Sequence, residues 1–410
     1  MKNIVLILAL SFIASAAYAS KARLEALGED QNGSRYIDDE RNIFLNPAEL
    51  NNHFDFMALD FGSTAQILDG ENTAKATGGV INKLGNKVYG VYFGQDSNTA
   101  AGQRIGAFAA VNDIDLGGGT KGMSDANYSA VATRLKNTNT VDIFYAREAA
   151  VKWGVKLNYS SSKDEVGSTG AVGETSQTGA SLTAGVIKGD WEIATTIGLA
   201  NNAEAEDVVT NVGTIDYEYK GAGGIELNVT KRNLDGSNYF LQARRIQAEQ
   251  DGLDDLTLGT TEVDDEWSVL RLVLGYGRVL KQNESLDLFY KGWIYNDQQT
   301  SKAFVKDNDV TEQYIGLLVG MESTLKDWLK IRGSVSNKFF GTADVDGDKK
   351  TIANAVDVNI GTSLIFGDMS IDGLIGTDAD GDGTLGETGD KGGVLRTDSL
   401  MSRVSMTYRF

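Results

Sequence analysis

The chain has 410 residues and a formal net charge of −19, with 48 glycines, 1 proline and no cysteine. The negative charge, without a basic stripe to offset it, argues against nucleic acid as a partner. The lack of cysteine excludes a disulfide framework, and the low proline content argues against a disordered or collagen-like chain. A glycine-rich, proline-poor chain suits curved β-sheet, because proline cannot donate to the strand ladder.

The first 19 residues have the pattern of a secretory signal peptide. Lys2 supplies a positive charge, residues 4–14 form a short apolar run, and Ala17-Tyr18-Ala19 matches the A-x-A cleavage site. We expect cleavage between Ala19 and Ser20. No later run reaches the roughly 18 apolar residues that a membrane-spanning helix needs, which excludes a helical membrane protein. The sequence therefore predicts an exported chain.

Residues 20–53 precede the first expected strand and lack its alternation. Asn46-Pro47-Ala48 has the pattern of a helix start, with asparagine as the cap and proline in the first turn. We expect this stretch to be a separate N-terminal segment, either in the periplasm or inserted into the lumen of the domain that follows.

Residues 54–410 alternate between apolar and polar positions in one stretch after another, which is typical of β-strands. In residues 329–340 the odd positions begin Leu329, Ile331 and Gly333, and the even positions begin Lys330 and Arg332. Seven short connections fall near residues 85–86, 148–149, 188–190, 234–236, 282–283, 326–327 and 367–368. Long polar connections are expected at residues 62–74, 95–138, 162–176, 201–214, 249–265, 297–311, 342–353 and 377–399.

Short periplasmic turns that alternate with long external loops are typical of outer-membrane barrels. The pattern predicts an all-β fold: a transmembrane, antiparallel, up-and-down β-barrel of about sixteen strands, with both termini on the periplasmic side. Fourteen or eighteen strands are the alternatives. Eighteen would result if residues 103–111 and 128–135 were strands, whereas we expect residues 95–138 to form an inserted loop.

A barrel of about this width is too wide for side chains to fill, so it is expected to hold an aqueous channel. The predicted pore-lining charges are Lys152, Lys156, Arg244, Arg271, Lys291, Lys330, Arg332, Lys338, Arg403, Asp216, Glu218, Asp287, Glu322, Asp357 and Asp372. Each of them could equally be a solvated wall residue or half of an ion pair. The loop of residues 95–138 is the candidate constriction, where Asp113 and Asp115 would face basic wall residues.

One acidic tract matches a calcium-binding loop in part. Asp378, Asp380 and Asp382 occupy positions 1, 3 and 5, glycine occupies position 6, and Thr384 follows. The acid expected at position 12 is replaced by Gly389. Calcium is therefore the one candidate cofactor, and an ordinary solvated acidic loop is the alternative.

The last strand, residues 401–410, alternates and ends in Tyr408-Arg409-Phe410. It resembles the C-terminal signal that the barrel assembly machinery reads, with Tyr408 and Phe410 facing lipid. Together with the exported start and the alternating loops, it makes the chain resemble the general outer-membrane porin family. The resemblance implies a multi-pass outer-membrane protein, in contact with lipid and lipopolysaccharide, that assembles as a homotrimer and lets small hydrophilic solutes diffuse passively.

The stretch DDERNIFLNPAEL at residues 38–50 resembles the N-terminal hatch of the long-chain fatty acid transporter family, which carries an NPA motif before its first strand. That family has fourteen strands and an apolar interior, whereas this chain predicts about sixteen strands and a charged one. A hatch-type transporter of hydrophobic substrates is therefore the alternative to a porin, and a structural or adhesive barrel is a third hypothesis. An enzyme is not expected, because His53 is the single histidine and precedes the first strand.

Overall fold

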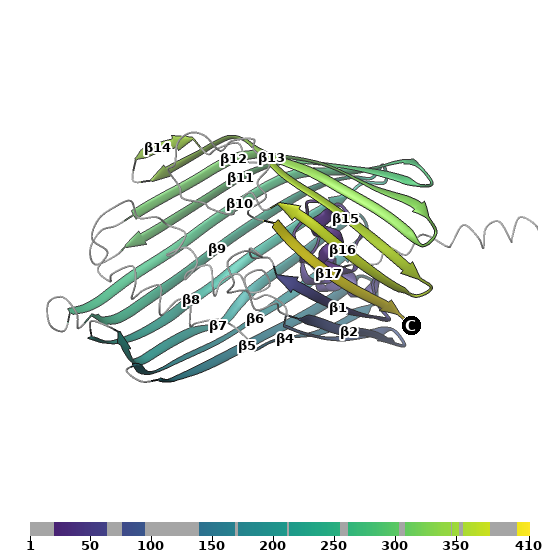
Figure 1. Cartoon of the computed structure of the whole chain (residues 1–410). Helices are drawn as coiled ribbons and strands as arrows, with labels where there is room; N and C mark the ends of the chain where they lie inside the picture. The colour runs from purple at the N-terminus through teal and green to yellow at the C-terminus, as the bar shows by residue number, and fades with distance from the viewer. Residues whose placement is uncertain are drawn as a thin grey trace, which may run out of the picture.

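A closed β-barrel makes up most of the molecule (Figure 1). The computed structural model describes residues 20–63, 76–94, 139–168, 171–210, 213–254, 261–302, 308–345, 347–351, 356–377 and 400–410. In these ranges 17 strands form one sheet, and β1 pairs with both β2 and β17, which closes the ring. Strand β14 pairs with β13 beyond the ladder that β13 forms with β15, so 16 of the 17 strands make up the wall. The predicted antiparallel barrel of about sixteen strands is confirmed.

The strands differ greatly in length. Their bounds are β1 Phe56–Ser63, β2 Thr77–Leu84, β3 Lys87–Phe93, β4 Asn139–Glu148, β5 Lys152–Ser168, β6 Ala171–Lys188, β7 Trp191–Thr210, β8 Gly213–Arg232, β9 Ser237–Asp254, β10 Thr261–Asn283, β11 Leu286–Lys302, β12 Asn308–Lys326, β13 Leu329–Val345, β14 Asp348–Thr351, β15 Val356–Phe366, β16 Met369–Thr377 and β17 Leu400–Arg409. Strands β5 to β13 have 17 to 23 residues, whereas β1 to β4 and β15 to β17 have 7 to 11.

The seven predicted short turns all fall between consecutive wall strands. Gly85, Gly189 and Gly367 adopt left-handed φ angles of 65°, 62° and 62° in three of them. Such angles suit the tight turns whose twist matches that of antiparallel strands, and glycine reaches them without a steric penalty. The short turns therefore lie together at one end of the barrel.

Several of the predicted long loops are wrong. The alternation ends near residue 162, yet β5 continues to Ser168 and β6 begins at Ala171. Strand likewise runs through most of residues 201–214, 249–265, 297–311 and 342–353. The physical reason is that a strand with water on both faces needs no continuous apolar face, so its sequence lacks regular alternation and reads like a loop.

The outer face of the wall is apolar. Exposed large side chains include Ile143, Leu157, Ile193, Leu270, Leu272, Leu274, Ile294, Leu317, Val319, Ile360 and Val404. Exposed aromatic residues lie near the turn end, among them Trp191, Tyr239, Trp328, Tyr408 and Phe410. An apolar belt around the whole sheet is far larger than the patches that soluble proteins expose. Among the described residues, no helix has the length and hydropathy to span a membrane.

The N-terminal segment, residues 20–53, runs inside the barrel near the turn end (Figure 1, purple). It contains α2 (Lys21–Ala26) and the 3₁₀ turns η1 (Glu40–Phe44) and η2 (Pro47–Asn51). Helix α2 packs on β13 and β15 to β17, and η2 packs on β3 to β6. The chain then leaves the lumen at Asp55, whose left-handed φ of 58° reverses its direction before β1.

Candidate functional site in the barrel lumen

The N-terminal segment is held to one wall by an apolar cluster. Ile43, Phe44 and Leu50 are buried against side chains of β1 to β4, including Ile81 and Phe144. The Phe44 ring meets the Tyr92 and Phe144 rings edge-on, at centroid distances of 5.1 and 5.5 Å. Edge-to-face pairs of this kind stabilise beyond their buried area. The segment therefore has its own packed core with the inner face of the barrel.

The local fold of η2 follows from the NPA motif. The side chain of Asn46 accepts a hydrogen bond from the backbone of Ala48 at 3.1 Å, and Pro47 takes the first position of the turn. The carbonyl of Pro47 lies against Gly154 on β5, where an added Cβ would come within 2.2 Å of that oxygen. Cap, proline and wall glycine together bring η2 into direct contact with the backbone of β5.

The opposite wall holds the segment through buried charges. Arg23 donates to Glu322 of β12 at 3.1 Å and pairs with Asp39 of the segment itself. Arg332 of β13 bonds the same Glu322 at 3.0 Å and Asp372 of β16 at 2.9 Å. The hydroxyl of Ser20 also donates to Asp372, at 2.9 Å. Segment and wall therefore share one continuous network of alternating charges.

The ionisation of the segment reflects this burial. Burial raises the pKa of Glu25 to about 7 against the lowering effect of Arg403 and Lys21. Burial likewise raises the pKa of Glu40 to about 7, although Arg409 and His53 lower it. The pKa of His53 lies above its ordinary value because, although burial lowers it, the carboxylates of Asp38, Glu49 and Glu40 together raise it more.

Four of the nine predicted basic pore-lining residues are bound to the segment. Lys152 donates to the Asn52 side chain at 2.5 Å, Lys156 to the Phe44 carbonyl at 3.0 Å, Lys291 to Glu29 at 2.6 Å, and Arg403 lies 3.1 Å from Glu25. Lys330 is buried on the inner face of β13. These positions face inward as the alternation predicts, and the four that bind the segment anchor it to the wall.

The remaining predicted residues are distributed as follows. Arg244, Arg271 and Lys338 lie on the inner wall further from the turn end, and Asp357 accepts from Ser336 at 3.0 Å. Asp287 of β11 stands opposite Glu322 in the ladder. Tyr408 and Phe410 are on the outer face, 42% and 56% exposed.

Other predicted residues lie outside the described part of the chain or in strand stretches whose side chains are not described. Asp113, Asp115, Asp378, Asp380, Asp382 and Thr384 lie outside the described residues, as does the predicted signal peptide. Asp216 and Glu218 lie in β8 beyond a shift in register between Lys220 and Gly223, and nothing of their side chains is described. A one-residue shift reverses which side chains share a face, so the alternation of the sequence does not carry across that point.

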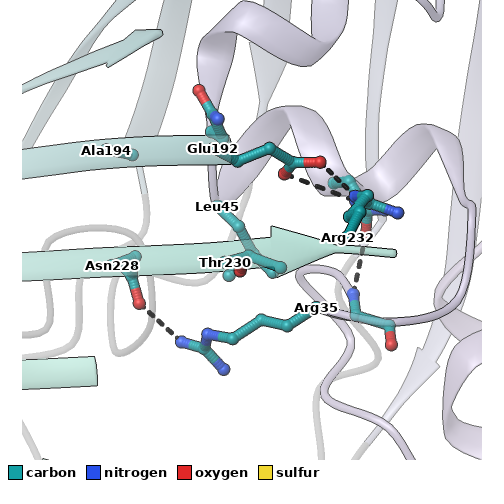
Figure 2. Close-up of a pocket in the computed structure, with 10 residues that line it drawn as sticks. Arg35, Leu45, Glu192, Ala194, Asn228, Thr230 and Arg232 are labelled. Carbon is teal, nitrogen blue, oxygen red and sulfur yellow. Dashed lines mark hydrogen bonds and ion pairs between the residues drawn. The ribbon is translucent and has the colours of Figure 1, made fainter. Parts of the chain in front are cut away.

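A small cavity of about 20 Å³ lies between the segment and the wall strands β7 and β8 (Figure 2). On its border Arg232 reaches the carboxylates of Glu192 and Glu49, and Arg35 donates to Asn228 at 2.7 Å. A cavity of this size has room for about one water molecule. It is a gap in the packing of the segment and offers no space for a solute.

The sequence reasoning missed the partners of the wall charges. Arg23, Glu25 and Glu29 belong to no motif, and Arg23 lies 299 positions from Glu322 in the chain. The one available signal was the high charge density of residues 20–53 in a stretch that also contains Phe44 and Leu50.

Gly154 offers a direct test of how closely the segment fits. We expect Gly154→Ala to push η2 away from β5 and to destabilise the docked segment by about 1–3 kcal/mol, because backbone atoms on both sides cannot yield. The measurement is protease protection of the segment together with the unfolding midpoint. Gly292→Ala is the matched control, since its Cβ would come no closer than 3.4 Å to a neighbour. Equal protection in both variants would contradict the described contact.

Comparison with known proteins shows likeness in fold only. No protein-family model and no curated protein matches the chain. A loop-deletion mutant of OmpT, an outer membrane protein of Vibrio cholerae, matches with 8% identity and a TM-score of 0.37, over 87% of this chain and 98% of the other. The P. putida toluene transporter TodX matches with 13% identity and a TM-score of 0.35, over 96% and 98%. The Ralstonia pickettii toluene transporter TbuX gives 11% identity and a TM-score of 0.36, over 96% and 98%. Identities and TM-scores this low indicate nothing about the function of this chain.

Proposed function

We propose that the protein is an outer-membrane channel for small hydrophilic solutes, which pass through the barrel lumen by diffusion. The observation that carries the proposal is that the described residues form a closed barrel of 16 wall strands. The outer face of this barrel is apolar and its inner face carries charged side chains. Barrels of this width enclose an aqueous channel or a plug, because side chains from the wall cannot fill them. An apolar belt with aromatic residues at its edge matches the lipid-facing surface of such barrels.

The docked segment adds a condition to this proposal. In the described conformation residues 20–53 occupy the lumen near the turn end, so solutes pass either beside the segment or after it has moved. This arrangement also favours a second candidate, a hatch-type transporter of hydrophobic substrates, because the capped turn at Asn46 and Pro47 lies inside the lumen. The polar groups around the segment support the hydrophilic alternative of the two.

Partners and chemistry follow as further parts of the proposal. The belt would contact lipid and lipopolysaccharide, the strand ending at Phe410 would be read by the barrel assembly machinery, and the functional unit would be a homotrimer. We propose no catalytic role, since His53 is engaged with Asp38 at 3.2 Å within the segment. Calcium binding at residues 378–384 stays a prediction.

The test is conductance of the full chain in a planar bilayer. Steady ohmic steps are expected, together with permeation of small sugars into vesicles that hold the protein. Inhibition of the steps by decanoate, without sugar permeation, would favour the hydrophobic candidate. The absence of both conductance and permeation would overturn a channel function and leave a structural or adhesive barrel.

A further inference from the structure

A row of charged and aromatic side chains crosses the inner wall on strands β8 to β13, apart from the contacts of the segment. In the strand ladders Glu226 stands opposite Arg244, Arg244 opposite Arg271, and Arg271 opposite Asp297. Residues directly opposite one another in antiparallel strands share a face, so these four side chains point into the lumen. Two guanidinium groups are thus direct cross-strand neighbours.

The arginine pair is costly for the fold. Like charges directly opposite in a sheet destabilise it. Arg271 has a close partner, because its Nη2 donates to Asp297 at 2.8 Å, whereas the nearest carboxylate oxygen to Arg244 belongs to Glu226 at 4.0 Å. Among the residues that the structure describes, Arg244 donates no hydrogen bond, although only 11% of its side chain is exposed. The five donors of this guanidinium are therefore available to an oxyanion that enters from the lumen.

An aromatic surface adjoins the pair. The Tyr295 and Tyr314 rings stack with 4.6 Å between centroids and 18° between planes. Arg271 lies 5.4 Å from the Tyr295 ring centre, and Lys338 lies 5.2 Å from that of Tyr314. The strand register is interrupted beside Tyr314, between Gln313 and Ile315, and Phe340 on the facing strand has a left-handed φ of 52°. Bulges and strained residues of this kind cluster at functional sites.

We infer that Arg244 and Arg271 bind the carboxylate of a small aromatic acid, whose ring rests against the Tyr295–Tyr314 stack. Planar guanidinium groups match a carboxylate in two-pronged geometry, and such charge-assisted bonds are the strong ones. Arg271 is 31% exposed, so the lumen reaches it. Glu226 and Asp297 flank the pair and limit the site to one negative charge. The inference rests on the proposed function in that it names the class of solute that the lumen would select.

The experiment measures binding of benzoate to the refolded full chain in detergent micelles by calorimetry. Saturable binding is expected, with acetate weaker because it lacks the ring and benzamide weaker because it lacks the charge. Arg244→Gln is expected to weaken benzoate binding roughly tenfold to a hundredfold, as the loss of hydrogen bonds to a charged group predicts. Arg245→Gln is the matched control, because its side chain is exposed on the outer face of the same strand.

Folding of the variant is checked independently. Arg244→Gln removes one of two opposed like charges, so it is expected to raise the unfolding midpoint or leave it unchanged. A loss of benzoate binding in this variant would then not result from unfolding. The absence of saturable benzoate binding, or equal binding by the Arg244 and Arg245 variants, would overturn the site. Equal affinity for acetate and benzoate would overturn its aromatic part. Binding in micelles does not require conduction, so a silent channel that still binds benzoate would refute the proposed function and leave the site intact.

Discussion

Replacing Arg23 with leucine is expected to release the N-terminal segment from the lumen and to raise channel conductance severalfold. The substitution removes the charge that faces Asp39 and Glu322, and Asp39 has no exposed side-chain surface. Removing one member of a buried ion network leaves an uncompensated charge and costs about 3–5 kcal/mol. Single-channel recording and protease sensitivity of residues 20–53 would measure the effect.

The matched control for this substitution is Arg278→Leu. Arg278 lies 3.7 Å from Asp235 near the turn end, and the two side chains are 32% and 57% exposed. Exposed pairs are screened by water and contribute little to stability, so conductance should stay at the wild-type value. A second variant, Arg23→Met with Asp39→Asn, leaves fewer buried charges unpaired and should recover part of the docking. If Arg23→Leu left both conductance and protease protection unchanged, the network would not hold the segment.

Lowering the pH from 8 to 5 is expected to strengthen docking of the segment. The pKa values of Glu25 and Glu40 rise from 4.5 to about 7 on burial, so the docked state binds these protons more tightly than the released state. The free-energy cost that these two carboxyl groups add to docking is therefore absent below pH 4.5. It grows above that pH and reaches its full value above pH 7. Each shift corresponds to about 3 kcal/mol, since one pKa unit is about 1.4 kcal/mol.

His53 acts in the same direction. Its pKa is raised in the docked state, so its contribution is fully present below the ordinary value of 6.5 and is lost as the pH rises through the raised value. The pKa of Asp38 is lowered to about 2, so its contribution stays constant between pH 5 and pH 8. Conductance and hydrogen exchange of the segment, followed over this range, would report the change.

The control for the pH effect is a double variant with Glu25→Gln and Glu40→Gln. Glutamine resembles the protonated carboxyl, so the variant should dock at pH 8 as the wild type does at pH 5. The pH dependence that His53 contributes should remain. Docking that weakened on acidification, or an unchanged pH profile in the double variant, would contradict the role of the two glutamates.

The sequence predicted the barrel well where one face is apolar. Strand residues such as Leu270, Leu272 and Leu274 face outward, and their alternation with Arg271 and Val273 marks the inner face. The prediction was wrong in the parts of β5 to β7 and β9 to β13 farthest from the short turns, where the regular alternation is lost. Seven turns could be located because glycine, asparagine and aspartate provide the local conformations that tight turns require.

The lumen was predictable only in part. The inward direction of Lys156, Arg332 and Arg403 follows from period-2 alternation, which is a local property. Their partners do not, since Ser20 and Asp372 meet across 352 positions and no local rule selects one buried carboxylate among many. The same limit applies to Arg244, because no local sequence pattern predicts that its side chain donates no hydrogen bond among the described residues.

The unequal strand lengths give the barrel a high side and a low side. Strands of 18 to 23 residues, as in β6 to β10, rise on the order of 50 Å at the usual tilt, about twice the apolar band of an outer-membrane barrel. The strands on either side of the β1–β17 seam end much sooner (Figure 1). In the proposed orientation, half of the rim facing the exterior is hydrogen-bonded sheet. An antibody fragment that binds there would touch several strands at once, and its epitope would exist only on the folded barrel.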